Sequence, residues 1–236
     1  MMGELSRLRS AKSGRFSSWD TSGRNADAWR IEPGETKVLA DIKGPGAITH
    51  IWMTQAKHYR ECLLKMTWDN VKRPSVLAPL GDFFCLGHGI VNSFQSLLFT
   101  ASTERNNQFN QGCALNGYAR MPFNERAVIE LINESDEPHW QYFYIDYETF
   151  NKANLDAGYF HAEFRRANPF GGWGREIRVN SAEAGADREP HVGLHGRGVL
   201  PVDQSAAVHE EIVLAVEGYR DLARGRDAGG GVNGDD

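Results

Sequence analysis

Short runs of β-branched and aromatic residues, separated by turn-forming residues, dominate the first 180 positions of the chain. Residues 37–42 and 48–54 are two such runs, and the Gly-Pro-Gly between them is typical of a turn between strands. In residues 62–68 the apolar side chains alternate along the run, which places them on one face of a strand. The Asp69-Asn70 pair that follows predicts a turn.

Five further runs have the same character, at residues 75–80, 96–100, 127–132, 140–147 and 158–165. Eight short strands with no long amphipathic helix between them indicate a sandwich. We therefore predict an all-β fold, an antiparallel jelly-roll sandwich, over residues 35–180. Residues 1–34 are predicted to form a loop segment that precedes it.

The composition changes near residue 180. Residues 181–236 hold 5 Lys and Arg against 11 Asp and Glu, and Tyr219 is their one aromatic residue. Such a segment cannot extend an aromatic core, so a domain boundary is expected there.

Within residues 181–236, apolar residues at steps of three and four predict an amphipathic helix over residues 206–224. The glycine-rich end, residues 229–236, reads as disordered. We therefore expect a divergent extension that is short, irregular or helical, and partly disordered.

Charge and cysteine content exclude several classes of protein. A formal net charge of −5 argues against nucleic acid and anionic membranes as partners. No window is apolar enough for a membrane span or a signal peptide, and the three cysteines have no C-x-x-C spacing. A cytoplasmic protein without a disulfide framework, zinc site or cofactor is expected.

The segment 79–89 is the first candidate site, because it combines three glycines with aromatic and polar side chains. Asp82 and His88 would orient a ligand by hydrogen bonds, and Phe83 would offer a flat apolar face. A β-turn in which the aspartate bonds to its own backbone explains the segment equally well.

The segment 17–27 is the second candidate, with Asp20, Asn25 and Asp27 beside Trp19. Carboxylates and amides receive sugar hydroxyls, and an indole stacks on a sugar ring. If both segments serve one ligand, this loop lies near Asp82 or His88. A purely structural loop is the alternative.

Two pairs of polar residues are spaced two apart on predicted strands. Asp146 and Glu148 would share a face, as the carboxylates of a glycoside hydrolase do, but a solvated strand face fits better. His161 and Glu163 repeat the spacing, and neither the ligand number nor a cysteine pair supports a metal there.

Five blocks of sequence, in one order, resemble the domain-of-unknown-function 2961 family, which overlaps glycoside hydrolase family 172. The blocks are Ser17-Ser18-Trp19-Asp20 with Gly23 and Asn25-Ala26-Asp27, Gly44-Pro45-Gly46 to His50-Ile51-Trp52, Pro79 to Gly89, Met121-Pro122-Phe123, and Tyr159-Phe160-His161-Ala162 with Arg165 to Pro169. The resemblance covers about residues 5–180. It implies an N-terminal jelly roll, substrate-binding roles that extend to His50 and Trp52, and assembly as trimers or larger rings. The implied partner is a carbohydrate containing fructofuranose or arabinofuranose.

The family's two catalytic glutamates lie in later motifs that resemble W-W-G-E-G-D and G-T-G-T-E-D-Y, and neither motif occurs in these 236 residues. The first hypothesis is therefore a truncated glycoside hydrolase-like chain that lacks the glutamates, with its catalytic residues unknown. The second is a non-catalytic carbohydrate-binding or assembly module. A third is a different hydrolase that uses Asp146 with Glu148 or Glu163.

Overall fold

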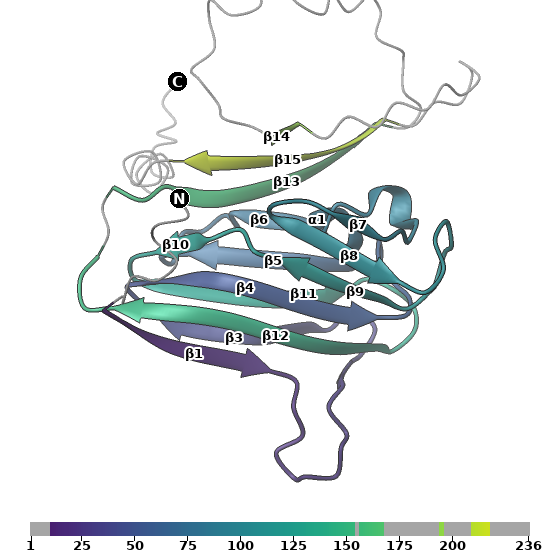
Figure 1. Cartoon of the computed structure of the whole chain (residues 1–236), viewed down its shortest axis with the longest axis horizontal. Helices are drawn as coiled ribbons and strands as arrows, with labels where there is room; N and C mark the ends of the chain where they lie inside the picture. The colour runs from purple at the N-terminus through teal and green to yellow at the C-terminus, as the bar shows by residue number, and fades with distance from the viewer. Residues whose placement is uncertain (1–9, 154–155, 168–193, 196–208, 218–236) are drawn as a thin grey trace, which may run out of the picture.

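The computed structural model describes residues 10–153, 156–167, 194–195 and 209–217. These residues form two β-sheets that pack face to face around one apolar core (Figure 1). Among the strands of these described residues, every pair is antiparallel except β6 with β13, which run parallel. The all-β sandwich expected from the sequence is confirmed.

One sheet has eight strands, with β12 and β4 at its centre and the order β1-β12-β4-β9-β8-β7. Two short strands pair outside this path, β2 with β12 and β10 with β4. The bounds are β1 Ala11–Ser17, β2 Trp29–Ile31, β4 Gly46–Gln55, β7 Phe94–Gln95, β8 Phe99–Thr103, β9 Cys113–Gly117, β10 Met121–Phe123 and β12 His139–Phe150.

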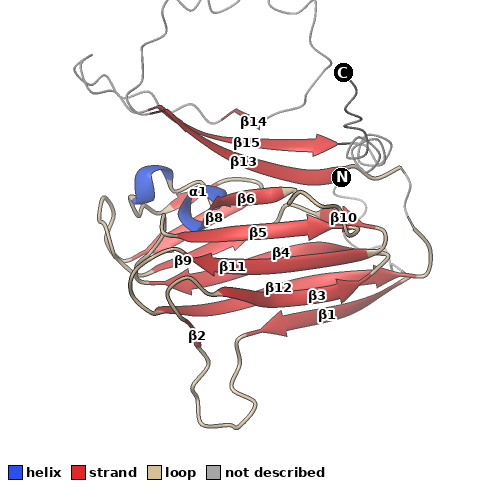
Figure 2. Cartoon of the chain, turned by 180° about the vertical axis from the view of Figure 1, so that it is seen from behind, coloured by secondary structure: helices blue, strands red, loops and turns tan. Residues whose placement is uncertain are grey.

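The other sheet has seven strands in the order β14-β15-β13-β6-β5-β11-β3. A short helix, α1, and a 3₁₀ turn, η2, follow β6 and lie near the end of the sandwich that carries β7 and β8 (Figure 2). The bounds are β3 Thr36–Lys43, β5 Cys62–Trp68, β6 Val76–Pro79, α1 Leu80–Phe83, η2 Gly87–Gly89, β11 Arg126–Asn133, β13 Tyr159–Ala167, β14 Leu194–His195 and β15 His209–Glu217.

Alternation of side chains explains why the central strands sit where they do. Along β5 and β11 every second residue is buried, as expected for strands with one face on the core. The predicted strand at residues 62–68 coincides with β5. Within the described residues no helix is long and apolar enough to cross a membrane.

The carboxylate of Asp69 joins three parts of the fold. Asp69 and Asn70 both have positive φ, as the central residues of a tight turn after β5 require, which confirms the predicted turn. The side chain is 3% exposed and accepts the backbone N–H groups of residues 124–126, between β10 and β11. It also accepts the hydroxyl of Tyr159, at the start of β13.

The helix predicted over residues 206–224 is wrong where the structure describes that segment. His209–Glu217 form β15, which pairs antiparallel with β13 along all nine residues. The β-branched residues Ile212, Val213 and Val216 favour a strand, and a neighbouring strand edge satisfies its backbone groups. The predicted boundary near residue 180 and the tail at 229–236 lie outside the described residues.

We expect Asp69→Asn to lower the free energy of unfolding by about 2 kcal/mol, measured by urea denaturation. Asparagine has nearly the same volume as aspartate and tolerates positive φ. The loss of stability therefore reports the one carboxylate oxygen that is replaced, which accepts a hydrogen bond from Tyr159 or from the backbone amides. The matched control is Asp41→Asn, which removes an exposed pair with Arg126 and costs less than about 1 kcal/mol. Equal losses in the two variants would contradict the central role of Asp69.

Candidate functional site

The outer face of the eight-stranded sheet gathers aromatic and polar side chains from β4, β9 and β12. Adjacent strands in register place Tyr144 opposite Trp52, and Trp52 opposite Asn116. One row further along, Asp146 lies opposite His50. These side chains alternate with buried residues of the same strands, so they point away from the core.

Four aromatic side chains form what we call the aromatic platform: Trp52 of β4, Tyr118, which follows β9, and Tyr142 and Tyr144 of β12. Trp52 stacks on Tyr144 with ring centroids 4.9 Å apart, and His50 stacks on Tyr118 at 4.8 Å. Tyr142 and Tyr144 are 43% and 39% exposed, although both lie in the middle of a strand. Exposed aromatic side chains at the centre of a sheet provide flat apolar surface for a ligand.

A polar network crosses the platform. The Nδ1 atom of His50 lies 3.0 Å from Oδ2 of Asp146, and its Nε2 atom lies 3.1 Å from Oδ1 of Asn116. Arg15, from the edge strand β1, holds Asp146 with two hydrogen bonds of 2.5 and 3.0 Å. The Arg15 guanidinium also lies 4.6 Å from the ring centroid of Tyr144. Each of these groups therefore has a set orientation.

The two carboxylates at the end of β12 are both paired with arginines. Burial acts to raise the pKa of Asp146, but hydrogen bonds from Arg15 and His50 outweigh it and hold that pKa below its ordinary value. Glu148 accepts a hydrogen bond of 2.8 Å from Arg120. Asp146 is ionised near neutral pH, and this is opposite to what a glycosidase general acid needs.

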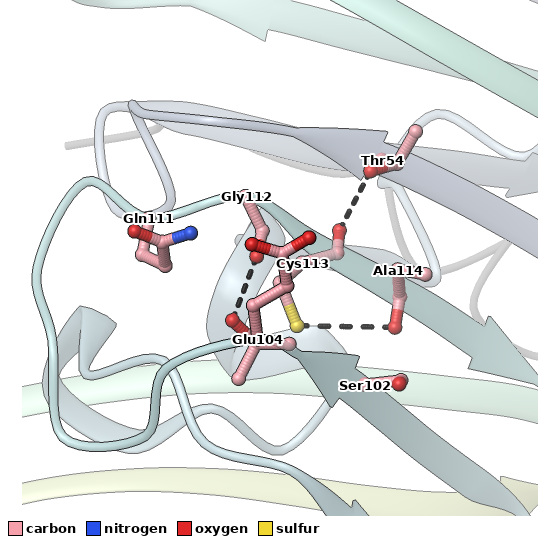
Figure 3. Close-up of a pocket in the computed structure, with 8 residues that line it drawn as sticks. Thr54, Ser102, Glu104, Gln111, Gly112, Cys113 and Ala114 are labelled. Atoms are coloured by element: carbon pink, nitrogen blue, oxygen red, sulfur yellow. Dashed lines mark hydrogen bonds between the residues drawn. The ribbon is translucent and has the colours of Figure 1, made fainter.

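An open pocket lies on the same face, where β4 and β8 end and β9 begins (Figure 3). Its volume is ≈ 410 Å³, and Thr54 of β4 contributes to its wall. Because Thr54 is the register partner of Tyr142, the pocket adjoins the aromatic platform. The lining residues are Thr54, Ser102, Thr103, Glu104, Gln111, Gly112, Cys113 and Ala114.

Two of the predicted site residues lie on this face, where His50 contacts Asp146 and Trp52 stacks on Tyr144. The segment 17–27 forms a loop that leaves the sheet at the edge formed by β1 and β2. There Asp20 accepts three backbone N–H groups and the Ser22 hydroxyl of its own loop, which lowers its pKa to about 2. Asp27 accepts the backbone N–H of Asp20, whereas Asn25 is exposed with positive φ. These contacts favour the structural alternative for both aspartates.

The other predicted segment, residues 79–89, is mostly part of the core. Phe83 is fully buried and packs edge-to-face on Phe84 and Phe99, so its ring offers no face to a ligand. Asp82 is 6% exposed and forms an ion pair of 2.9 Å with Arg60. His88 is exposed on η2, with positive φ.

The prediction that the two loops share one site is wrong. The 17–27 loop extends from the edge of the sandwich near β1, whereas α1 lies beside β6 and β8, far from that edge (Figures 1 and 2). The strand order, with β1 at one edge and β7 at the other, keeps them apart.

Sequence reasoning missed the exposed row Trp140, Tyr142 and Tyr144, although its strict alternation with buried Phe143 signals it. It also missed Asn116, on a strand that was not predicted, and the pocket residues of the loop between β8 and β9. Among the described residues, potential metal ligands group elsewhere, at His58, Cys62 and His139.

The low pKa of Asp146 predicts how its variants respond to pH. The ion pair of Asp146 with Arg15 stabilises the fold above about pH 4, where the carboxyl group is ionised in the folded and in the unfolded state. This stabilisation is lost as the pH falls through the pKa of Asp146 in the folded state, which is the lower of the two. Asp146→Asn is therefore expected to lower Tm by about 2–4 °C at pH 7, with a smaller difference at pH 3. The control is the same substitution in an Arg15→Gln background, where the difference in Tm that Asp146→Asn causes is expected to depend less on pH. The same difference at both pH values in the wild-type background would contradict the assignment.

Comparison with known families relates a large part of this sandwich to a glycoside hydrolase family. A family model described as GH172 domain-like matches residues 22–144, which is more than half of the 236-residue chain. Among curated proteins, none matches the sequence. The matched residues span β2 to the middle of β12, so they include the platform, the pocket and most of both sheets. The chain belongs to the GH172 domain-like family, which is related to glycoside hydrolases.

Proposed function

We propose that this chain binds a furanose-containing carbohydrate on the outer face of its eight-stranded sheet and does not hydrolyse it. The observation that carries the proposal is the adjacency of the platform and the pocket. Thr54 lines the pocket and pairs with Tyr142, so a ligand that rests on the aromatic rings reaches the pocket's polar groups.

The chemistry of the two neighbouring regions is complementary to a sugar. One face of a sugar ring is apolar and stacks on aromatic side chains, which Tyr142 and Tyr144 supply at the surface. Sugar hydroxyls need donors and acceptors, and the pocket offers the hydroxyl of Ser102, the carboxylate of Glu104 and the amide of Gln111. The preference for a furanose rests on the family alone.

The placement of the carboxylates supports binding without hydrolysis. Retaining and inverting mechanisms both need two carboxyl groups that flank the scissile bond. Glu104 is the single carboxylate among the residues that line the pocket. Asp146 and Glu148 are each held by an arginine, and the family's two glutamate motifs do not occur in these 236 residues.

Glu163 does not complete a pair with Asp146. It lies on β13, in the seven-stranded sheet, where it is 65% exposed and paired with Arg165. Asp146 lies on β12, in the eight-stranded sheet, so the two carboxylates belong to different layers of the sandwich. The hypothesis of a different hydrolase therefore has no support from this geometry.

Self-association through the same face is the second candidate function. Trp140, Tyr142 and Tyr144 form a row of exposed aromatic side chains, which is also typical of an interface between subunits. In this case the platform is buried in a homo-oligomer, and sugar does not reach it. Sedimentation velocity of the wild type and of Tyr144→Ala separates the two candidates, because only an interface dissociates with the substitution.

We expect Tyr142→Ala and Glu104→Ala each to weaken binding of arabinofuranose- or fructofuranose-containing oligosaccharides by about tenfold or more, measured by isothermal titration calorimetry. The first removes an exposed stacking surface, and the second removes an acceptor for sugar hydroxyls. Leu77→Ala, which removes an exposed apolar side chain from β6 in the other sheet, is the control and leaves affinity unchanged. Wild-type affinity in both site variants would reject this location.

Purified chain is expected to give no turnover of chromogenic arabinofuranosides or fructofuranosides above the uncatalysed rate. Positioning by the sheet supplies only part of a glycosidase's rate enhancement when the acid and the nucleophile are absent. Turnover that disappears in Asp146→Asn or Glu148→Gln would contradict the proposal and restore a catalytic role to these carboxylates.

A further inference from the structure

A buried group of two histidines and a cysteine lies between the sheets, at the opposite side of β12 from the platform. His139 is the first residue of β12, Cys62 is the first residue of β5, and His58 lies in the connection from β4 to β5. One ligand atom from each residue lies within 4.8 Å of the other two. His139 and Cys62 are essentially inaccessible, and the His58 side chain is 11% exposed.

We propose that His58, Cys62 and His139 bind one Zn²⁺ ion that links the two sheets of the sandwich. Two imidazoles and a thiolate are ligands that zinc prefers. The ligands come from both layers, because β12 belongs to the eight-stranded sheet and β5 to the seven-stranded sheet.

The separation of the two rings suits tetrahedral zinc. The Nδ1 atoms of His58 and His139 are 3.3 Å apart. Two nitrogens bound to zinc at 2.0–2.1 Å with a tetrahedral angle are separated by about 3.3–3.4 Å, and a nitrogen and a sulfur by about 3.6 Å. The two nitrogens therefore already stand at the separation that zinc requires, whereas the Cys62 sulfur, up to 4.8 Å from the histidine ligand atoms, needs a shift of up to about 1.2 Å. A water completes the fourth position.

Hydrogen bonds around the cluster turn the His139 lone pair toward the proposed ion. The Nε2 atom of His139 lies 3.0 Å from Oε1 of Gln141. The Gln141 amide nitrogen donates to the carbonyl of Thr54, so Oε1 is the acceptor and His139 carries its proton on Nε2. Its Nδ1 is then an unprotonated acceptor that faces His58. A hydrogen-bond acceptor for the nitrogen that does not bind the metal, here Nε2, is typical of histidines that bind metal.

His58 has the same arrangement in weaker form. Its Nε2 atom lies 3.9 Å from Oε2 of Glu137, a carboxylate that also pairs with Lys57. A proton on Nε2 is favoured by that carboxylate, which leaves Nδ1 of His58 directed at Nδ1 of His139. Two lone pairs at this separation repel each other unless a cation or a shared proton lies between them.

A shared proton is the competing explanation. In that arrangement a neutral His58 carries its proton on Nδ1 and donates it to Nδ1 of His139, so no metal is needed.

Binding releases one proton. The Cys62 thiol loses its proton to solvent as the thiolate sulfur bonds to Zn²⁺, and both imidazoles bind through lone pairs without a change in protonation. No oxidant or reductant takes part. The ion then ties the start of β12 to the start of β5.

The test uses tag-free, chelator-treated protein titrated with Co²⁺ as a spectroscopic probe and then with Zn²⁺. We expect one Co²⁺ per chain, with a thiolate-to-cobalt charge-transfer band in the near ultraviolet and visible bands of four-coordinate cobalt, both displaced by Zn²⁺. Zinc at about 100 times its Kd is expected to raise Tm by about 5–10 °C.

Cys62→Ser removes the charge-transfer band, whereas Cys85→Ser, which changes a thiol outside the cluster, retains it. If Cys62→Ser fails to fold, His58→Asn provides the second variant, because its side chain is on a connection and not in a strand. That variant lowers Co²⁺ affinity at least tenfold. A wild-type protein without the charge-transfer band, or a band that survives Cys62→Ser, overturns the proposal and leaves the hydrogen-bonded histidine pair.

Discussion

The register between β4 and β12 determines what each face of the molecule presents. Side chains of a strand alternate between two faces, so a shift of one residue would exchange the core residues Phe143 and Ile145 for Tyr144 and Asp146. The burial of the apolar set therefore holds the polar and aromatic set at the surface. The platform and the His50–Asp146 contact depend on this register, and so does the position of His139 on the inner side.

A β-bulge between β4 and β12 keeps the same side chains on the same faces near the C-terminal end of β12. The register shifts between Asp146 and Tyr147, where β4 contributes an extra residue, Thr49. Beyond the shift Tyr147 still packs on the core and Glu148 still points outward. The bulge keeps both carboxylates on the outer face, and there each meets an arginine from a neighbouring segment. A face that neutralises its own carboxylates in this way suits ligand binding better than proton transfer.

The strands that alternate clearly were predictable from the sequence, since burial of one face imposes the pattern. The segment at 62–68 matches β5 end for end, and 127–132 lies within β11. By contrast, residues 1–34 were predicted to be a loop segment, and β1 and β2 form there instead. β1 carries Lys12, Ser13 and Gly14 with little alternation, and it exists because β12 offers a long edge for pairing. Local sequence cannot reveal an element that its partner stabilises.

The candidate sites were harder to predict, for a related reason. The aromatic pair at 83–84 resembles a ligand surface when read locally, and only the packing of Phe99 and Phe160 against Phe83 shows that it belongs to the core. Glycine-rich turns with aromatic residues occur in both settings, so composition alone does not separate them. His50 and Trp52 were found through the family resemblance, whereas their partners Asn116 and Tyr144 come from other strands and follow from pairing alone.

The two proposed sites share β12 but no side chain, and this has a physical consequence. His139, which belongs to the histidine–cysteine group, and Gln141 are buried on the inner side of β12. Trp140 and Tyr142, on the same stretch of backbone, point outward. An ion held by His139 would stabilise the pairing at the start of β12 without contact to the platform. Loss of the ion would therefore affect the platform only by moving β12. We expect it to lower the free energy of unfolding and to have a smaller effect on the affinity for sugar. The sandwich thus places the proposed zinc ligands on its inner side and the proposed carbohydrate surface on its outer side.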